Sequence, residues 1–239
     1  MSGSAARRAR FAATAALVSL TFLAAPRAGA QAVSPAQAAQ ASQSADLAPD
    51  VLVKNVTLEV VDIIQKDKEI QGGGAAGKKK VVALIETKVL PHFNFQAMTA
   101  SAVGRNWEKA TPEQKARLAE EFKTLLVRTY SSALAAYSNQ KFDFRPLRAK
   151  PTDTDVTVNV RVLQSGAQPV TIDYDMEKRP NGWKVWDVRV GGISLVANYR
   201  TEFDNVVREK GVDGLIKSLQ AKNSSLETAA AAPAGAAKK

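Results

Sequence analysis

The chain has 239 residues, with 33 Lys and Arg against 23 Asp and Glu, one His and no Cys. The lack of Cys excludes disulfide scaffolds, thiol nucleophiles, cysteine zinc sites and lipid-anchored lipoproteins, and the single His92 excludes a multi-histidine metal site. The length fits one or two domains.

The first 30 residues predict an export signal. Arg7, Arg8 and Arg10 precede an apolar run over residues 11–25, and Ala28-Gly29-Ala30 is the small-x-small pattern that a signal peptidase cuts. The run is too short to cross a bilayer, which takes roughly 20 apolar residues. We therefore expect export of the chain and cleavage near Ala30.

Loss of the four arginines in this segment lowers the formal net charge from +10 to +6. The remaining positive and negative charges are interspersed, as in Glu120-Glu121-Phe122-Lys123, and form no arginine-rich arm. We therefore expect no nucleic-acid binding, whereas anionic lipid headgroups or an acidic partner remain open.

Two segments have compositions that cannot bury enough apolar surface to fold. Residues 31–48 are rich in Ala, Gln and Ser, and residues 223–239 end in an Ala-rich run. We predict a flexible linker and a flexible tail there. The rest, residues 49–222, has the size of one domain.

The first predicted helix is amphipathic. Apolar residues at helical spacing from Val53 to Ile64 face a core, and the pattern resumes from Val82 to Val89 after a break at residues 72–77. Gly72–Lys78 fits the phosphate-loop pattern GxxxxGK. However, the next residue is Lys rather than Ser or Thr and no strand is predicted before it, so we interpret the segment as a linker.

Two further helix starts carry capping signals. Asn94 is a predicted N-cap with Phe93 and Met98 placed for a hydrophobic staple, and Thr111 with Gln114 forms a capping box around a proline at the first helical position. The second of these helices carries a long apolar stripe: Leu118, Phe122, Leu125, Leu126, Tyr130, Leu134 and Tyr137.

From Phe142 the apolar period changes from helical to two. Residues 156–162 and 170–176 alternate apolar and polar, Asn181-Gly182 is a hairpin turn signal, and residues 183–190 are predicted to return as another strand. Short turns predict an antiparallel meander. Ser194 then caps a predicted helix, and apolar residues at 215–219 predict a last one.

These elements predict an α+β fold in which helices cover a curved, mainly antiparallel sheet. Such a fold can enclose a hollow, but an apolar stripe looks the same when it fills a core. An enzyme on this fold would need a polar constellation in the hollow, and Asp173 and Asp175 lie on the side of their strand opposite Ile172 and Tyr174. We therefore expect no catalytic group and no metal or cofactor. A carrier of apolar ligands and an interaction module without a pocket remain open.

Several segments, in this order behind an export signal, resemble the MlaC family, the periplasmic toluene-tolerance or ABC-transporter auxiliary proteins. The resemblance covers about residues 49–222. It rests on residues 90–95 (LPHFNF), 102–107 (AVGRNW), 111–114 (TPEQ), Tyr130, 183–188 (WKVWDV), 192–196 (GISLV), Tyr199, Arg200 and Phe203.

The resemblance implies a periplasmic phospholipid carrier whose helices and twisted sheet enclose an apolar pocket for acyl chains. It also implies two partners: an inner-membrane ABC transporter complex with an MCE-domain subunit, and an outer-membrane lipoprotein-porin complex. The process implied is maintenance of outer-membrane lipid asymmetry. We expect a monomer with bound phospholipid as cargo.

A carrier of this kind needs a dry pocket with the charged headgroup left at its mouth. Arg105 and Arg200 are our candidates for headgroup contacts. The expected pocket lining is Val103, Trp107, Phe122, Leu125, Leu126, Tyr130, Val158, Val160, Ile172, Tyr174, Trp186, Val188, Ile193 and Val196.

Overall fold

The structure is a computed structural model that describes residues 47–135, 140–164 and 166–231. The expected export signal, almost all of the expected linker and the last eight residues of the expected tail lie outside these ranges. No described helix is long and apolar enough to cross a bilayer.

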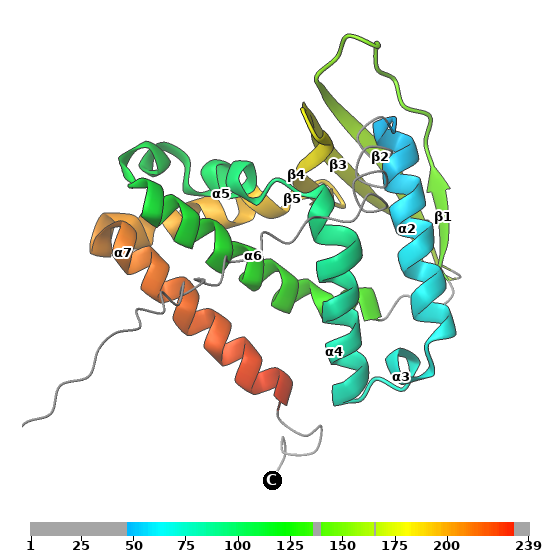
Figure 1. Ribbon diagram of the computed structural model, residues 1–239, viewed down its shortest axis with the longest axis horizontal. Helices are drawn as coiled ribbons and strands as arrows, with labels where there is room; N and C mark the ends of the chain where they lie inside the picture. The colour runs from blue at the N-terminus through cyan, green and yellow to red at the C-terminus, as the bar shows by residue number, and fades with distance from the viewer. Residues whose placement is uncertain (1–46, 136–139, 165, 232–239) are drawn as a thin grey trace, which may run out of the picture. The chain divides into compact units, whose positions relative to one another are not determined.

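The first part of the domain is helical (Figure 1). Helix α2 buries Val53, Val60 and Ile64, as its apolar spacing predicts. Helix α4 begins inside the glycine stretch that we interpreted as a linker, and no described strand precedes it. The bounds are α2 (Pro49–Lys66), α3 (Lys68–Gln71), α4 (Ala75–Leu84), the π-helix η1 (Ile85–Val89) and the 3-10 helix η2 (Leu90–His92).

Both predicted capping motifs are confirmed in the helices that follow, α5 (Phe95–Val103) and α6 (Pro112–Ala135), which the 3-10 helix η3 (Gly104–Lys109) connects. The Asn94 side chain accepts a hydrogen bond from the backbone N–H of Ala97 at 3.1 Å. Thr111 Oγ accepts from the Gln114 N–H at 3.2 Å, and the Gln114 side chain accepts from the Thr111 N–H at 3.0 Å.

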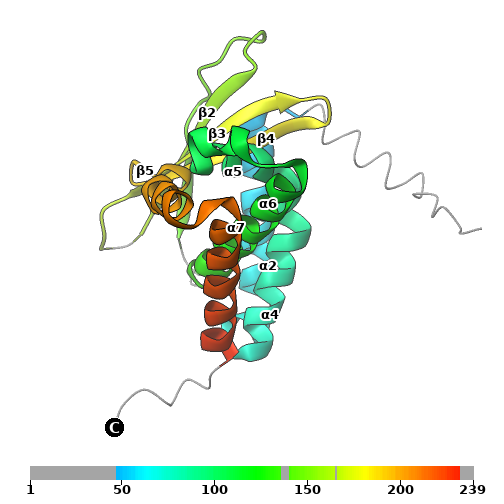
Figure 2. The same cartoon turned by 90° about the vertical axis from the view of Figure 1, so that its left-hand side faces the viewer.

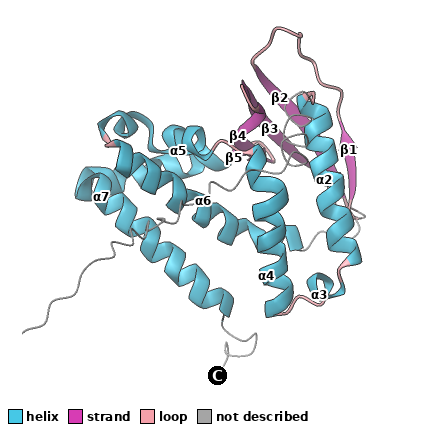
Figure 3. Ribbon diagram, in the orientation of Figure 1, coloured by secondary structure: helices cyan, strands magenta, loops and turns pink. Residues whose placement is uncertain are grey.

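Five strands form one antiparallel sheet in chain order (Figure 3). The predicted meander is confirmed, and Gly182, at the hairpin between β3 and β4, has φ 96°. Glycine reaches this conformation without the strain of a side chain. The strands are β1 (Lys141–Phe144), β2 (Asp155–Leu163), β3 (Val170–Arg179), β4 (Gly182–Val190) and β5 (Ile193–Ser194).

A β-bulge in β4 changes which residues share a face of the sheet. Asp175 pairs with Asp187, but its neighbour Met176 pairs with Val185, so Trp186 is the extra residue. Strict alternation would put Trp186 and Val188 on one face. Instead Val185 and Val188 pack in the same apolar cluster, and Trp186 lines a cavity on the polar face.

The last helix, α7 (Leu195–Ala231), begins at the predicted cap, where Ser194 Oγ accepts from the Ala197 N–H at 2.9 Å. It bends at Gly211, whose φ is 70°, and then runs in a new direction (Figure 2). Contrary to the flexible tail expected from residue 223, the helix continues to Ala231. The Asn223 side chain is buried and donates to the Glu121 backbone carbonyl at 3.0 Å, which ties this segment to α6.

Three apolar clusters hold the described elements together. We call the first the aromatic core: it joins α5, α6 and α7 and includes Phe122, Tyr199 and Phe203. The second packs Leu52 and Val53 of α2 against the sheet, and the third joins α2, α3 and α4. Burial of these side chains supplies the main stabilisation of the fold.

Candidate functional site

An apolar cavity of about 580 Å³ lies between helix α2, the η1–η2 segment, the second half of α6, one face of the sheet and the start of α7. We call it the apolar cavity. It separates elements that would otherwise pack directly, and it is larger than the voids of a water molecule's size that remain in ordinary cores.

Helices supply one wall of the apolar cavity. The face of α2 that carries Val56, Val60 and Ile64 turns toward it, and Leu126 and Val127 of α6 contribute from another side. Ile85 and Val89 come from the π-helix η1. Because π-helical turns are rare and are frequently found at functional sites, their presence in this wall fits a binding role.

The sheet supplies the opposite wall and part of the mouth. Ile172, Tyr174 and Val188 line the cavity from β3 and β4. At the end of the sheet, Val190 is 38% exposed and Ile193 is 67% exposed, although both also line the cavity. An apolar rim therefore connects the hollow with solvent.

Among the described residues that line the apolar cavity there is no Lys, Arg, Asp or Glu. Its polar groups are few, namely Thr57, Ser131, Asn198 and the hydroxyls of Tyr130 and Tyr174. Burial raises the pKa of Tyr130, and the neighbouring Tyr199 adds to the increase. Tyr130 therefore stays neutral at physiological pH, and the described part of the lining carries no charge.

Six of the residues expected to line a pocket do line the apolar cavity. They come from the second half of α6, the cavity face of the sheet and the turn after it. They are Leu126, Tyr130, Ile172, Tyr174, Val188 and Ile193.

The other eight lie elsewhere, because an apolar stripe does not reveal what it faces. Val103, Phe122, Leu125 and Val196 are buried in the aromatic core. Val158 and Val160 are buried between α2 and the sheet. Trp107 packs against the aromatic core with the Lys115 ammonium 5.5 Å from its ring centre, and Trp186 lies on the opposite face of the sheet.

Neither candidate arginine lines the apolar cavity. Arg105 forms an ion pair with Asp204 at 3.5 Å, and the guanidinium of Arg200 donates to the Ser101 carbonyl at 2.8 and 3.1 Å. These contacts tie η3 and α5 to α7, on the side of the aromatic core.

The sequence interpretation missed the contribution of α2 and of the η1–η2 segment to the lining. The apolar spacing of Val56, Val60 and Ile64 was visible, but we assigned it to a core. The apolar spacing of Ile85 and Val89 was visible too. No local signal distinguishes such residues from core residues, because the distinction depends on what lies opposite.

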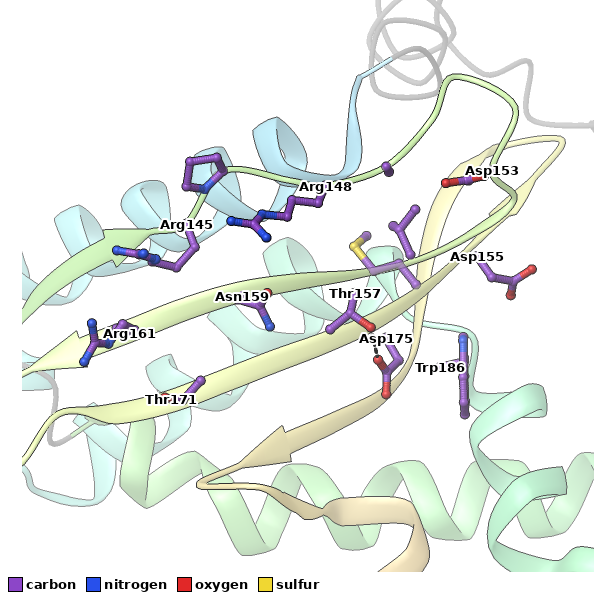
Figure 4. A pocket seen from close by; sticks show the side chains of 14 residues that line it. Arg145, Arg148, Asp153, Asp155, Thr157, Asn159, Arg161, Thr171, Asp175 and Trp186 are labelled. Carbon is purple, nitrogen blue, oxygen red and sulfur yellow. Dashed lines mark hydrogen bonds between the residues drawn. The ribbon is translucent and has the colours of Figure 1, made fainter.

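A second, larger cavity of about 830 Å³ lies on the other face of the sheet (Figure 4). Its lining is polar, with arginines and aspartates in equal number. Asp175 is buried and accepts from Thr157 Oγ at 2.7 Å and from Arg189; Asp173 accepts from the Asn159 amide at 2.6 Å. As predicted, the two carboxylates lie opposite Ile172 and Tyr174, but Asp175 does not face solvent.

This network does not resemble a catalytic site, because its carboxylates are already engaged by hydrogen bonds and by an arginine. In the described part of the chain, no group of three or more His, Asp or Glu side chains is placed to hold a metal ion. The apolar cavity is therefore the stronger candidate for a binding site.

Comparison with known proteins identifies the family. The model of the MlaC protein family matches residues 54–221, more than half of the chain. The intermembrane phospholipid transport system binding protein MlaC of Haemophilus influenzae is 23% identical over 140 residues, 57% of this chain and 65% of that protein. The toluene tolerance protein ttg2D of Pseudomonas putida is 32% identical over 105 residues, 44% of this chain and 48% of that protein. The chain thus spans less than two thirds of either relative.

A solved structure is also similar. The phospholipid-binding protein of Ralstonia solanacearum, determined in complex with a phospholipid, is 38% identical, with a TM-score of 0.69 over 76% of this chain and 99% of that one. The α+β fold expected from the sequence is that of a known phospholipid-binding protein. With the family match over most of the described domain, these likenesses show that the chain belongs to the MlaC family.

Proposed function

We propose that this protein is a phospholipid carrier that holds acyl chains in the apolar cavity. The observation that carries the proposal is a lining whose described residues include no charged side chain and that is open at an apolar rim. The phospholipid bound to the similar Ralstonia protein supports it.

The energetics of lipid transfer require such a cavity. At about 0.8 kcal/mol per buried CH₂, two long acyl chains represent more than about 20 kcal/mol of gross transfer free energy. A carrier can extract them from a bilayer only if its interior is comparably apolar. The headgroup is costly to bury, so it stays at the mouth near Ile193 and Asn198.

The carrier acts in the periplasm after removal of residues 1–30, as a monomer without catalytic activity. It exchanges lipid with an inner-membrane ABC transporter complex containing an MCE-domain subunit and with an outer-membrane lipoprotein-porin complex. The family membership supports these partners and this location.

Solvent extraction and lipid mass spectrometry of protein purified without detergent test the proposal. We expect phospholipids in roughly stoichiometric amount, and ATP should not change their retention because no nucleotide takes part in acyl-chain binding. Spectra without lipid would refute lipid carriage. Detection of a different apolar compound would mean that this compound, and not phospholipid, is the cargo.

A further inference from the structure

A cluster of lysines lies at the tip formed by α3 and the start of α4, and none of them lines the apolar cavity. α3 is beside the ends of both α2 and α4 (Figure 1). Lys68 belongs to α3, and Lys78 and Lys79 belong to the second turn of α4; all three are exposed. We call these three residues the lysine tip.

The lysine tip carries charge that its surroundings do not neutralise. The adjacent Lys80 forms ion pairs with Asp67 and Glu69, each at 2.8 Å, and Lys66 pairs with Asp62 at 2.8 Å. The carboxylates of Asp62, Asp67 and Glu69 are therefore already engaged by other lysines. Within the described residues, none of the three lysines of the tip has a carboxylate within salt-bridge distance.

The local structure holds these charges together although helix electrostatics oppose the arrangement. The first turn of α4 contains no acidic residue, and three lysines follow near this N-terminal end. Because the N-terminus is the positive end of the helix dipole, this is the less favourable place for cations. Gly77 lets α4 pack closely on α3, because a Cβ there would lie 2.2 Å from the Glu69 carbonyl oxygen. The positive tip is thus a built feature of the fold.

The composition of the tip decides what kind of surface it fits. Protein interfaces are enriched in Arg and aromatic residues and depleted of Lys. Residues 65–80 contain no Arg, no aromatic residue and no exposed large apolar side chain; besides the lysines and buried Ile70 they are Gln, Gly, Ala and the paired Asp67 and Glu69. Clustered lysines of this kind are typical of sites that bind anionic lipid headgroups.

We propose that the lysine tip docks the protein on the surface of an anionic phospholipid bilayer. Each lysine near such a surface contributes about a fivefold increase in affinity, so three together contribute on the order of 100-fold. This contribution decreases at high ionic strength, because salt screens exposed charges. The proposal does not depend on the apolar cavity, which shares no residue with the tip.

Vesicle sedimentation tests the proposal with the protein as purified from expressing cells. One set of vesicles contains phosphatidylcholine alone, and the other contains equal amounts of phosphatidylcholine and phosphatidylglycerol. The test variant combines Lys68→Gln, Lys78→Gln and Lys79→Gln. The control variant removes the same charge at Lys54, Lys178 and Lys217, which are exposed on α2, β3 and α7.

We expect the wild-type protein and the control variant to prefer the anionic vesicles, and the test variant to lose affinity for them on the order of 100-fold. The matching Lys→Arg variant should retain the preference, and salt should abolish it. Equal binding to both vesicle types overturns the proposal. This is the result expected if the lysine tip binds an acidic protein partner instead of a membrane. An equal loss in the test and control variants also overturns the proposal.

Phospholipid extracted from the test variant separates this proposal from the proposed function. The variant should fold and carry as much lipid as the wild-type protein, because the tip is not part of the cavity. Loss of both vesicle binding and bound lipid would contradict the independence of the two surfaces. A wild-type protein that binds anionic vesicles but carries no phospholipid would contradict only the carrier function.

Discussion

Helix α6 passes through two apolar surroundings that differ in what lies opposite. At Phe122, rings from α7 fill the space, with centroids 5.2 Å away for Tyr199 and 5.4 Å away for Phe203. One turn later, Leu126 is at the edge of this core and also lines the hollow in front of the sheet. The two positions share one apolar stripe, so composition alone does not separate a core from a cargo site. Whether a position on the stripe belongs to a core or to a cargo site depends on the element that lies opposite it.

Introducing a negative charge into the aromatic core and into the apolar cavity gives the largest expected difference between the two regions. Leu125 is fully buried in the aromatic core, so Leu125→Asp strands a carboxylate without a partner and costs several kcal/mol of stability, on the order of the total for a domain. Ile172→Asp places the same charge on the cavity wall, where it should abolish lipid retention while the protein stays folded. Circular dichroism and lipid extraction distinguish the two. A folded Leu125→Asp protein would contradict the comparison.

Truncation of apolar side chains sharpens the same contrast. Phe122→Ala removes a ring from a filled core and should lower the free energy of unfolding by about 3–5 kcal/mol. Leu126→Ala enlarges an existing hollow, so we expect a cost of about 2 kcal/mol, at the low end for such a change. Urea denaturation of both variants measures the difference. Equal costs would mean that the cavity is packed like the core.

A substitution on the polar face of the sheet should lower the stability of the protein without changing the amount of bound lipid. Asp175→Ala removes the acceptor of the Thr157 hydroxyl and one of the two carboxylates that pair with Arg189, which keeps Asp173 at 3.6 Å, so we expect a cost of about 1–3 kcal/mol. Lipid extracted per folded protein should not change, because Asp175 lies across the sheet from the apolar cavity. A variant of normal stability that releases its lipid would instead connect this face with binding.

The smallest expected effect is a pH dependence from His92. Burial, helped by the positive charge of Lys184, holds the pKa of His92 below its ordinary value of 6.5. The unfolded chain then binds the proton more tightly, so the His92 contribution to stability is present above pH 6.5 and is lost as the pH falls below it. His92→Gln should therefore show a smaller decrease in melting temperature between about pH 7 and pH 5. Equal decreases in both proteins would rule out this role.

Local signals in the sequence were sufficient for most of the elements. The side chains of Asn94, Thr111 and Ser194 form the predicted caps, and the change to a period of two marks the meander. These features depend on residues only a few positions apart. The same locality explains why they could be predicted without knowledge of the tertiary structure.

The parts that could not be predicted depend on distant residues. The adjacent apolar residues Val185 and Trp186 interrupt the alternation, but the local pattern does not show which of the two turns to the polar face. Residues 223–231 have a composition typical of a tail, yet contacts of Asn223 with Glu121 hold them as helix. Leu126 and Tyr130 of the α6 stripe line a hollow because α2 and the sheet form its other walls.

A phospholipid with a photoreactive group in its acyl chain gives the most direct test of where the cargo lies. After illumination and digestion, we predict labelled peptides from α2, from the second half of α6 and from the cavity face of β3 and β4, which contribute the lining. Labels confined to the aromatic core or to the polar face of the sheet would contradict the account.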